Sequence, residues 1–204
     1  MTDQGTKQAL RKHFIALREQ LPEALRAAHS AAITERLLQL PEYRQARTVM
    51  GYMNFGAEFA SELWVPQVLA DGKRLILPKV NQHTNHLDLY WVDDFETQLA
   101  QGLWGIREPI VERCTRVFAL NEVEFVLLPG VAFTREGARL GYGGGFYDKL
   151  FADLTHRPIL ATACFSLQIA EHLPQEATDV KVDLIATELE RISCPALHRG
   201  DNTN

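Results

Sequence analysis

Apolar residues recur at helical spacing near the start of the chain. Leu10 and Phe14 share one face of a helix expected over residues 7–21. A second amphipathic pattern covers residues 22–40 and ends before Pro41, because proline lacks the N–H group that would continue a helix. The pattern therefore predicts two amphipathic helices at the start of the chain.

A strand, a helix and a second strand follow these helices. Residues 48–53 and 74–78 are apolar and bounded by polar residues, as buried strands are, and Ser61 could cap a helix between them. Pro66 is tolerated only in the first turn of that helix, so the helix either starts later than Ser61 or bends. The βαβ order predicts that these two strands are parallel.

Further strands are expected along the rest of the chain. The apolar run over residues 125–128 is typical of a central strand that is buried on both faces. The alternation of helices and strands predicts one α/β catalytic domain over residues 1–197, followed by a disordered polar tail over 198–204. The other expected strands cover residues 87–92, 158–164 and 183–187.

Composition and charge narrow the class of protein. The 204 residues are 46% hydrophobic and 23% charged, which suits one globular core. A net charge of -5 disfavours nucleic acid as a partner. The polar N-terminus resembles no signal peptide, and no stretch of about 18 apolar residues predicts a membrane span. We expect a cytoplasmic monomer.

The cysteines and histidines predict no metal centre or disulfide framework. Cys114, Cys164 and Cys194 are odd in number and far apart, which favours ordinary thiols in a reducing compartment. The seven histidines are scattered, and His83 and His86 lack an accompanying Glu or Cys ligand. No zinc site is expected.

Glycines cluster after the strand at residues 125–128. Gly141, Gly143, Gly144 and Gly145 fall within five positions, although each glycine loses more backbone entropy on folding than another residue would. Backbone N–H groups that approach a phosphate explain such a cluster, whereas a flexible linker would favour serine. The spacing matches neither a Walker A loop nor the dinucleotide fingerprint.

The stretch LLPGVAFTREGARLGYGGGFYDKLF resembles the signature of the 5-formyltetrahydrofolate cyclo-ligase family, in which Pro-Gly is followed by Arg-Leu-Gly-x-Gly-x-Gly-Phe/Tyr-Tyr-Asp. The resemblance spans residues 7–188. It implies a three-layer α/β/α fold with a mostly parallel sheet, similar to the NagB/RpiA/CoA-transferase-like fold. Shorter stretches that also resemble the family are KQALR, MNFGAE, ILPK, LWGIREP and DVKVD.

The resemblance implies an ATP site made of two segments. Lys7 and Arg11 stand one helical turn apart, so both can reach the same phosphates, and Arg139 is placed to counter charge on the transferring phosphoryl group. Lys7 and Arg139 are therefore the catalytic candidates. The full set that the resemblance implies for ATP is Lys7, Gln8, Ala9, Leu10, Arg11, Arg139, Leu140, Gly141, Tyr142, Gly143, Gly144, Gly145, Phe146 and Tyr147.

The resemblance also implies a folate site and a magnesium site. Asp148 and Asp183 match the magnesium ligands of the family, and carboxylate oxygens suit that ion. Tyr142 and Gly144 occupy the variable positions of the glycine signature. The residues implied for the folate substrate are Met53, Glu58, Trp104, Tyr142, Gly143, Gly144, Gly145 and Phe146.

The implied reaction is the cyclisation of 5-formyltetrahydrofolate to 5,10-methenyltetrahydrofolate, with ATP as co-substrate, magnesium as cofactor, and ADP and phosphate as products. Phosphorylation of the formyl oxygen would prepare the carbon for attack by N10. Such a reaction requires positioning residues, which agrees with the absence of a nucleophilic triad from the motifs. Two alternatives stay open: a folate or nucleotide sensor without turnover, and an enzyme resembling phosphosugar isomerases or CoA-transferases that needs no ATP.

Overall fold

The computed structural model describes residues 3–152, 154, 156–176 and 178–195. The two predicted N-terminal helices are present as α1 (Asp3–Glu19) and α2 (Glu23–Gln39), separated by Pro22 at the start of α2. The short α3 (Pro41–Gln45) follows, with Pro41 in its first turn. Proline therefore ends one helix and opens the next, because its fixed φ suits a first turn.

Eight strands form the main sheet, in the order β12-β11-β10-β7-β1-β2-β3-β6. The five strands from β11 to β2 are parallel, and β12, β3 and β6 pair antiparallel at the two edges. The prediction of an α/β fold with a mostly parallel sheet is confirmed. The strands of this sheet are β1 (Thr48–Met50), β2 (Arg74–Asn81), β3 (His86–Val92), β6 (Thr115–Val117), β7 (Phe125–Leu128), β10 (Ile159–Ala163), β11 (Leu184–Ala186) and β12 (Arg191–Ser193).

The predicted βαβ unit is present with shifted boundaries. β1 and β2 pair in parallel, as expected, but β1 stops at Met50 and does not reach residue 53. Between them, Ser61 opens only the 3₁₀ turn η1 (Ser61–Leu63), and the helix α4 (Val65–Ala70) begins after it. Pro66 lies in the first turn of α4, where a missing N–H group costs nothing.

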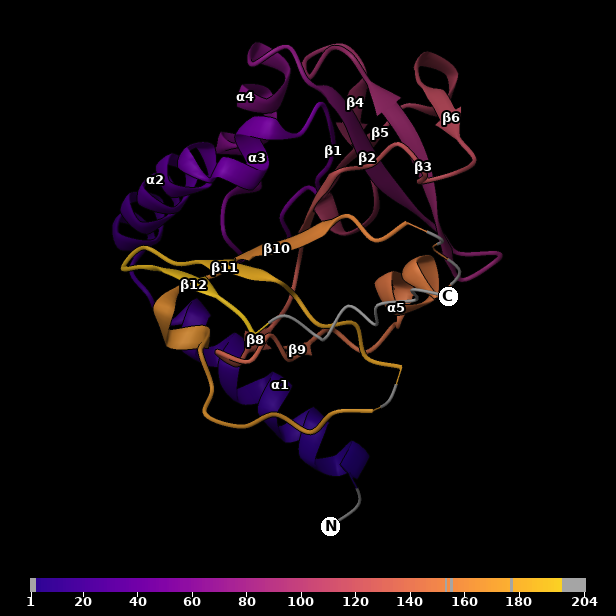
Figure 1. Cartoon of the computed structure of the whole chain (residues 1–204). Coiled ribbons are helices and arrows are strands. Elements are labelled where there is room, and N and C mark those ends of the chain that lie inside the picture. The colour runs from indigo at the N-terminus through magenta and orange to yellow at the C-terminus, as the bar shows by residue number, and fades with distance from the viewer. Residues whose placement is uncertain (1–2, 153, 155, 177, 196–204) are drawn as a thin grey trace, which may run out of the picture.

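Side chains of β7 show that both faces of the sheet are covered. Phe125 and Leu127 belong to a core cluster shared with α2, α3 and α4, whereas Val126 and Leu128 point to a second cluster that includes α5 (Phe146–Phe151). Figure 1 shows these helices on the two sides of the sheet. The continuous apolar run that predicted a central strand is thus explained by burial on both faces.

Helix α1 lies apart from these layers, beneath the small hairpin of β8 (Ala132–Phe133) and β9 (Arg139–Leu140) (Figure 1). Phe14 packs there against Leu140 and Leu173 in a third core cluster. The N-terminal helix therefore contacts segments from the last third of the chain.

The remaining short elements lie in connections. A second small sheet pairs β4 (Leu99–Gln101) with β5 (Arg107–Pro109), and the 3₁₀ turn η2 (Leu103–Gly105) joins them. Two more 3₁₀ turns are η3 (Val111–Arg113) and η4 (Ser166–Gln168). None of these strands was predicted.

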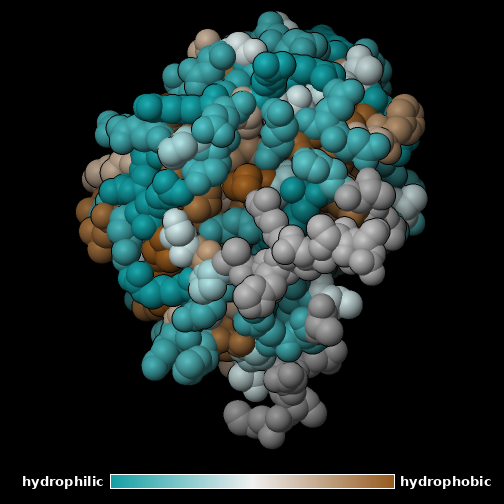
Figure 2. All heavy atoms as spheres, in the orientation of Figure 1, coloured by the Kyte–Doolittle hydropathy of each residue, from teal (hydrophilic) through white to brown (hydrophobic). Residues whose placement is uncertain are grey.

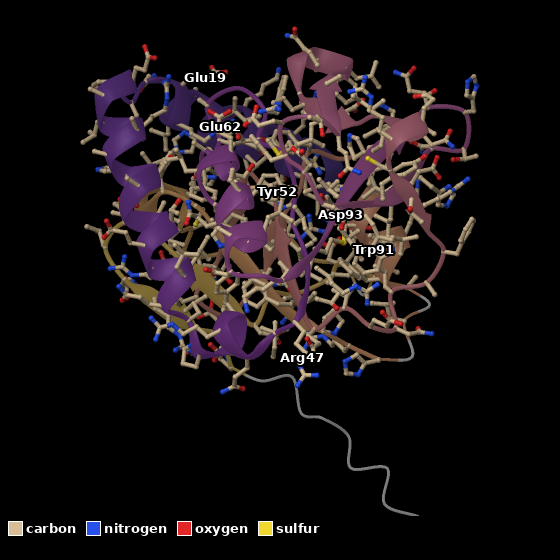
Figure 3. All side chains as sticks on the ribbon, turned by 90° about the horizontal axis from the view of Figure 1, so that it is seen from above. Glu19, Arg47, Tyr52, Glu62, Trp91 and Asp93 are labelled. Atoms are coloured by element: carbon tan, nitrogen blue, oxygen red, sulfur yellow. The ribbon has the colours of Figure 1, made fainter. Side chains whose placement is uncertain are left out.

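The surface is mainly hydrophilic on the face drawn in Figure 2, where hydrophobic residues form separate patches. Seen from above, Arg47 projects at the rim, whereas Tyr52 lies inside the molecule and is 4% exposed (Figure 3). No helix among the described residues is long and apolar enough to cross a membrane. The predicted polar tail, residues 198–204, lies outside the described residues.

Candidate active site

A cavity of about 1300 Å³ lies between α1, the connection from β9 to α5, and the segment that precedes β11. Residues from both ends of the sequence therefore build one cavity. Its wall consists of Lys7, Gln8, Arg11, Pro129, residues 139–149, Phe151, Ala152, Leu154, Arg157, Pro158, Leu160, Glu176 and residues 178–181.

The glycine cluster forms one wall of this cavity and requires glycine at several positions. Gly143 and Gly145 have φ angles of 105° and 63°, a region that other residues enter only with strain. A Cβ atom on Gly144 would lie 2.6 Å from the Phe146 ring. The backbone of this loop is thus exposed to the cavity, as a phosphate cradle requires.

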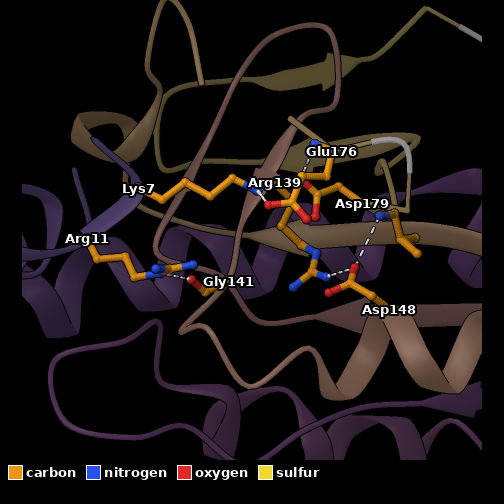
Figure 4. Close-up of polar contacts among 8 residues, drawn as sticks. Lys7, Arg11, Arg139, Gly141, Asp148, Glu176 and Asp179 are labelled. Carbon is orange, nitrogen blue, oxygen red and sulfur yellow. Dashed lines mark hydrogen bonds and ion pairs between the residues drawn. The ribbon is translucent and has the colours of Figure 1, made fainter. Parts of the chain in front are cut away.

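Lys7 and Arg11 of α1 face the glycine loop from the opposite wall. The Arg11 Nε donates a hydrogen bond to the Gly141 carbonyl oxygen at 2.8 Å. The Lys7 Nζ lies 3.0 Å from carboxylate oxygens of both Glu176 and Asp179, and Lys7 is only 7% exposed (Figure 4). The helical spacing predicted that both cations share one face, and both line the cavity.

The two carboxylates determine the charge of Lys7. Burial alone lowers the pKa of Lys7, but hydrogen bonds to Glu176 and Asp179 raise it, and the resulting pKa lies above the usual value. Lys7 is therefore a permanent cation at neutral pH, held by acidic partners that an anionic ligand could replace.

Arg139 is fixed at the base of the glycine loop. Its Nη2 lies 2.7 Å from the Asp148 Oδ1, which also accepts a hydrogen bond from the Val180 N–H at 3.1 Å (Figure 4). The Arg139 side chain is 5% exposed, and its buried Nε has no hydrogen-bond partner among the described residues. A ligand that enters the cavity would find this guanidinium already oriented.

Asp183, the second predicted magnesium ligand, stands just before β11 (Leu184–Ala186). Its two carboxylate oxygens accept hydrogen bonds from the Arg157 Nη1 at 2.7 Å and the Leu160 N–H at 2.8 Å. Asp148 lines the cavity, but Asp183 is not part of its wall. Within the described ranges, no group of three or more His, Cys, Asp or Glu residues could hold a metal ion.

Glu58 is the centre of a buried polar cluster beside the glycine loop. The Tyr142 hydroxyl donates to its Oε1 at 2.5 Å, and the Phe55 N–H donates to its Oε2 at 2.7 Å. The Arg18 Nη1 lies 4.0 Å from the same Oε1. Burial raises the pKa of Glu58, against the lowering effects of Tyr142, Arg18 and the Phe55 N–H.

The other predicted residues lie outside the cavity wall. Leu10 packs with Phe14 in the core beneath the hairpin, as expected for a residue on the apolar face of α1. Met53 is partly buried against the core cluster of α2 to α4. Trp104 is 63% exposed on η2 with a φ angle of 55°, and Ala9 is exposed on α1.

A family model described as the 5-formyltetrahydrofolate cyclo-ligase family matches residues 3–188, which is most of the chain. The chain belongs to this family. The family and the enzyme class that the sequence predicted, a ligase, are thereby confirmed. The match begins in α1 and ends beyond β11, so both walls of the cavity lie within it.

Individual relatives agree with this assignment. A 5-formyltetrahydrofolate cyclo-ligase from Haemophilus influenzae is 29% identical over 85% of this chain and 93% of its own length. The mouse protein of the same name is 26% identical over 84% and 92% of the two chains. The solved structure of 5,10-methenyltetrahydrofolate synthetase from Aquifex aeolicus is 33% identical and covers 97% of this chain and 99% of its own, with a TM-score of 0.79.

Several residues at the candidate site were not predicted as site residues. Glu176 and Asp179 hold Lys7, and Arg18 and Tyr52 surround Glu58. Arg18 carried a signal in the sequence, because positions 7, 11, 14 and 18 follow one face of a helix. The contacts of Glu176 and Asp179 span 169 and 172 positions, and no local pattern reports such contacts.

Proposed function

We propose that the chain catalyses the ATP- and magnesium-dependent cyclisation of 5-formyltetrahydrofolate to 5,10-methenyltetrahydrofolate. The observation that carries this proposal is the cavity in which Lys7, Arg11 and Arg139 converge on a glycine loop, in a chain of the cyclo-ligase family. Three cations around exposed backbone suit a triphosphate, which carries more charge than one cation can balance.

The residues have distinct roles in this proposal. Lys7 and Arg11 hold the phosphates, with Lys7 exchanging Glu176 and Asp179 for phosphate oxygens. Arg139 counters the charge on the transferring phosphoryl group, because its guanidinium is fixed in advance by Asp148. Residues 141–147 support the phosphates through their backbone.

Asp148 fits a magnesium ion, and Asp183 fits it less directly. The Asp148 carboxylate lies on the cavity wall and contacts Arg139 and the Val180 N–H through one oxygen, so the other oxygen would serve the ion. Both oxygens of Asp183 accept hydrogen bonds, so Asp183 would have to exchange its Arg157 contact. Mg²⁺ commonly takes one or two carboxylates, with phosphate and water completing its shell. When bound, the ion would neutralise negative charge on the phosphates.

The proposed reaction has two steps. The formyl oxygen attacks the γ-phosphorus of ATP, the bond to ADP breaks, and an imidoyl phosphate forms at N5. N10 then attacks the formyl carbon and loses its proton, while the carbon–oxygen bond breaks and phosphate leaves with the oxygen. The chain acts by aligning the two substrates, and no covalent bond to a side chain is required.

Glu58 would accept hydrogen bonds from N–H groups of the pterin, with Met53, Trp104, Tyr142 and Phe146 offering apolar or aromatic surface. Tyr142 contributes directly, since its side chain already contacts Glu58. The glycine loop would therefore serve both substrates.

The test is the absorbance of the conjugated methenyl product after mixing the purified chain with 5-formyltetrahydrofolate, magnesium and ATP. Control mixtures lack ATP or magnesium. Product that requires both components would support the proposal. Saturable folate binding without product would favour a sensor, and absence of folate binding would favour an activity of the phosphosugar isomerase or CoA-transferase type.

A further inference from the structure

Arg18 is the most deeply buried cation of α1. It follows Lys7, Arg11 and Phe14 along one face of the helix and is 3% exposed. Burying a cation is costly unless partners replace its water. The location of Arg18 therefore calls for a reason beyond packing.

The partners of Arg18 form a closed triangle with it. The Arg18 Nη2 donates to the Tyr142 hydroxyl oxygen at 2.8 Å, and the same hydroxyl donates to the Glu58 Oε1 at 2.5 Å. The Arg18 Nη1 lies 4.0 Å from that oxygen. The Arg18 Nε is buried and has no hydrogen-bond partner among the described residues. Arg18 thus acts on Glu58 both through its charge and through Tyr142.

We propose that Arg18 and Tyr142 are positioning residues that keep the Glu58 carboxylate ionised and aimed at the folate substrate. This inference rests on the proposed function and deepens it, because it explains how a buried glutamate remains an acceptor for pterin N–H groups. A protonated Glu58 would carry a hydrogen on one oxygen and lose part of its capacity to accept.

The electrostatics around Glu58 favour this role. Its charged neighbour is Arg18 of α1, and its titratable neighbours are Tyr142 of the glycine loop, Tyr52 after β1 and Tyr147 of α5. Burial and the Glu58 charge raise the pKa of all three tyrosines, so they stay neutral near pH 7. Among these described residues, Glu58 is therefore the one that can gain or lose a proton at moderate pH.

Tyr142 stands at a variable position of the glycine signature, so this triangle depends on the residues of this particular chain. Its side chain is anchored at Glu58, yet the residue is 43% exposed. Tyr142→Phe removes only the hydroxyl and leaves the ring, so the fold should tolerate it. This makes Tyr142→Phe the primary test variant.

The experiment measures the Kd of 5-formyltetrahydrofolate by calorimetry across a pH series, without ATP. Affinity of the unaltered chain should fall as pH drops through the pKa of Glu58. Tyr142→Phe should move the midpoint upward by about one pH unit, because the ionised form loses a hydrogen bond. Arg18→Met should move it in the same direction, and Arg18→Lys should restore part of the shift.

Controls separate positioning from folding. Tyr43→Phe removes the hydroxyl of another buried tyrosine, which donates a hydrogen bond to Asp71 at the end of α4, and should leave the midpoint in place. Glu58→Gln should remove the pH dependence.

If Arg18→Met fails to fold, Tyr142→Phe still decides the question. An unchanged midpoint in Tyr142→Phe, with folate binding and turnover intact in the unaltered chain, would overturn this inference alone. Failure of the unaltered chain to bind folate would overturn the proposed function with it.

Discussion

The sequence singled out Arg139 as a candidate residue, but it could not predict where the side chain lies. Its side chain lies across the base of the glycine loop and is paired with Asp148 at 2.7 Å, so its orientation precedes any ligand. A cation fixed in advance spends no energy on reorganisation when charge develops on a phosphoryl group. Under the proposed function, Arg139 would therefore contribute to the reaction as well as to the fold.

Arg139→Ala should lower kcat of the cyclo-ligase reaction by about 100-fold to 1000-fold, the usual loss for one preorganised donor. Product absorbance under saturating substrates measures this. Arg135→Ala is the matched control, because Arg135 is exposed and pairs with Glu190 at the surface. Turnover close to that of the unaltered chain, in an Arg139→Ala protein with normal thermal unfolding, would remove Arg139 from the mechanism.

Among individual residues, the sequence predicted features that follow from local spacing. The i and i+4 spacing of Lys7 and Arg11 predicted that both share one helix face, and both line the cavity, as does the glycine loop. It could not predict that Lys7 pairs with Glu176 and Asp179, because tertiary packing alone brings these side chains together.

Helix α1 depends on its packing for stability. Phe14 is 8% exposed and belongs to a small core cluster with residues of the β8–β9 hairpin and Leu173. A helix of this length is marginal by itself, so the apolar face must supply most of its stability. Because Lys7, Arg11 and Arg18 lie on the same helix, the docking of α1 sets the position of all three cations.

Phe14→Ala should lower the free energy of unfolding by about 3 kcal/mol, through lost burial and a cavity beside Leu140. Chemical denaturation measures this change. Lys12→Ala, on the exposed side of α1, should alter stability by less than about 0.5 kcal/mol. Equal effects of the two substitutions would show that α1 does not depend on this cluster.

The sequence predicted elements according to their length and apolar content. The buried strand β7 (Phe125–Leu128) was found with its observed boundaries. Strands of two or three residues, such as β8, β9 and β12, contain too few positions for a period of two to be recognised. The chain leaves the sheet after Met50, so β1 is shorter than the predicted strand over residues 48–53. The sequence stays apolar through Met53 and carries no sign of this exit.

At the scale of the whole molecule, the class of fold could be predicted but the order of strands could not. Alternating helices and strands indicate a layered α/β protein. The order places β1 between β7 and β2, and this arrangement depends on which apolar faces match in space. The cavity depends on packing beyond this order, because it joins α1 to segments near β9, β10 and β11.

The three thiols should be unreactive in the folded protein. All three are free, and burial raises the pKa of each thiol. The pKa of Cys194 is raised to about 11. Since the thiolate is the nucleophile, labelling by a disulfide reagent should be slow near neutral pH. It should accelerate only as the pH approaches the raised pKa values of the thiols. Unfolding should release three rapidly labelled thiols. One fast thiol in the native protein would contradict this.

The pairing of Lys7 with Glu176 and Asp179 also has a consequence for biosynthesis. A ribosome makes Lys7 of α1 well before its carboxylate partners, which are 169 and 172 positions further along the chain. Leu173, in the cluster around Phe14, is equally late. The apolar face of the nascent helix therefore stays uncovered until most of the chain has emerged from the ribosome. A chaperone could bind the helix during that interval. Moving α1 to the other end of the chain by circular permutation would shorten that interval.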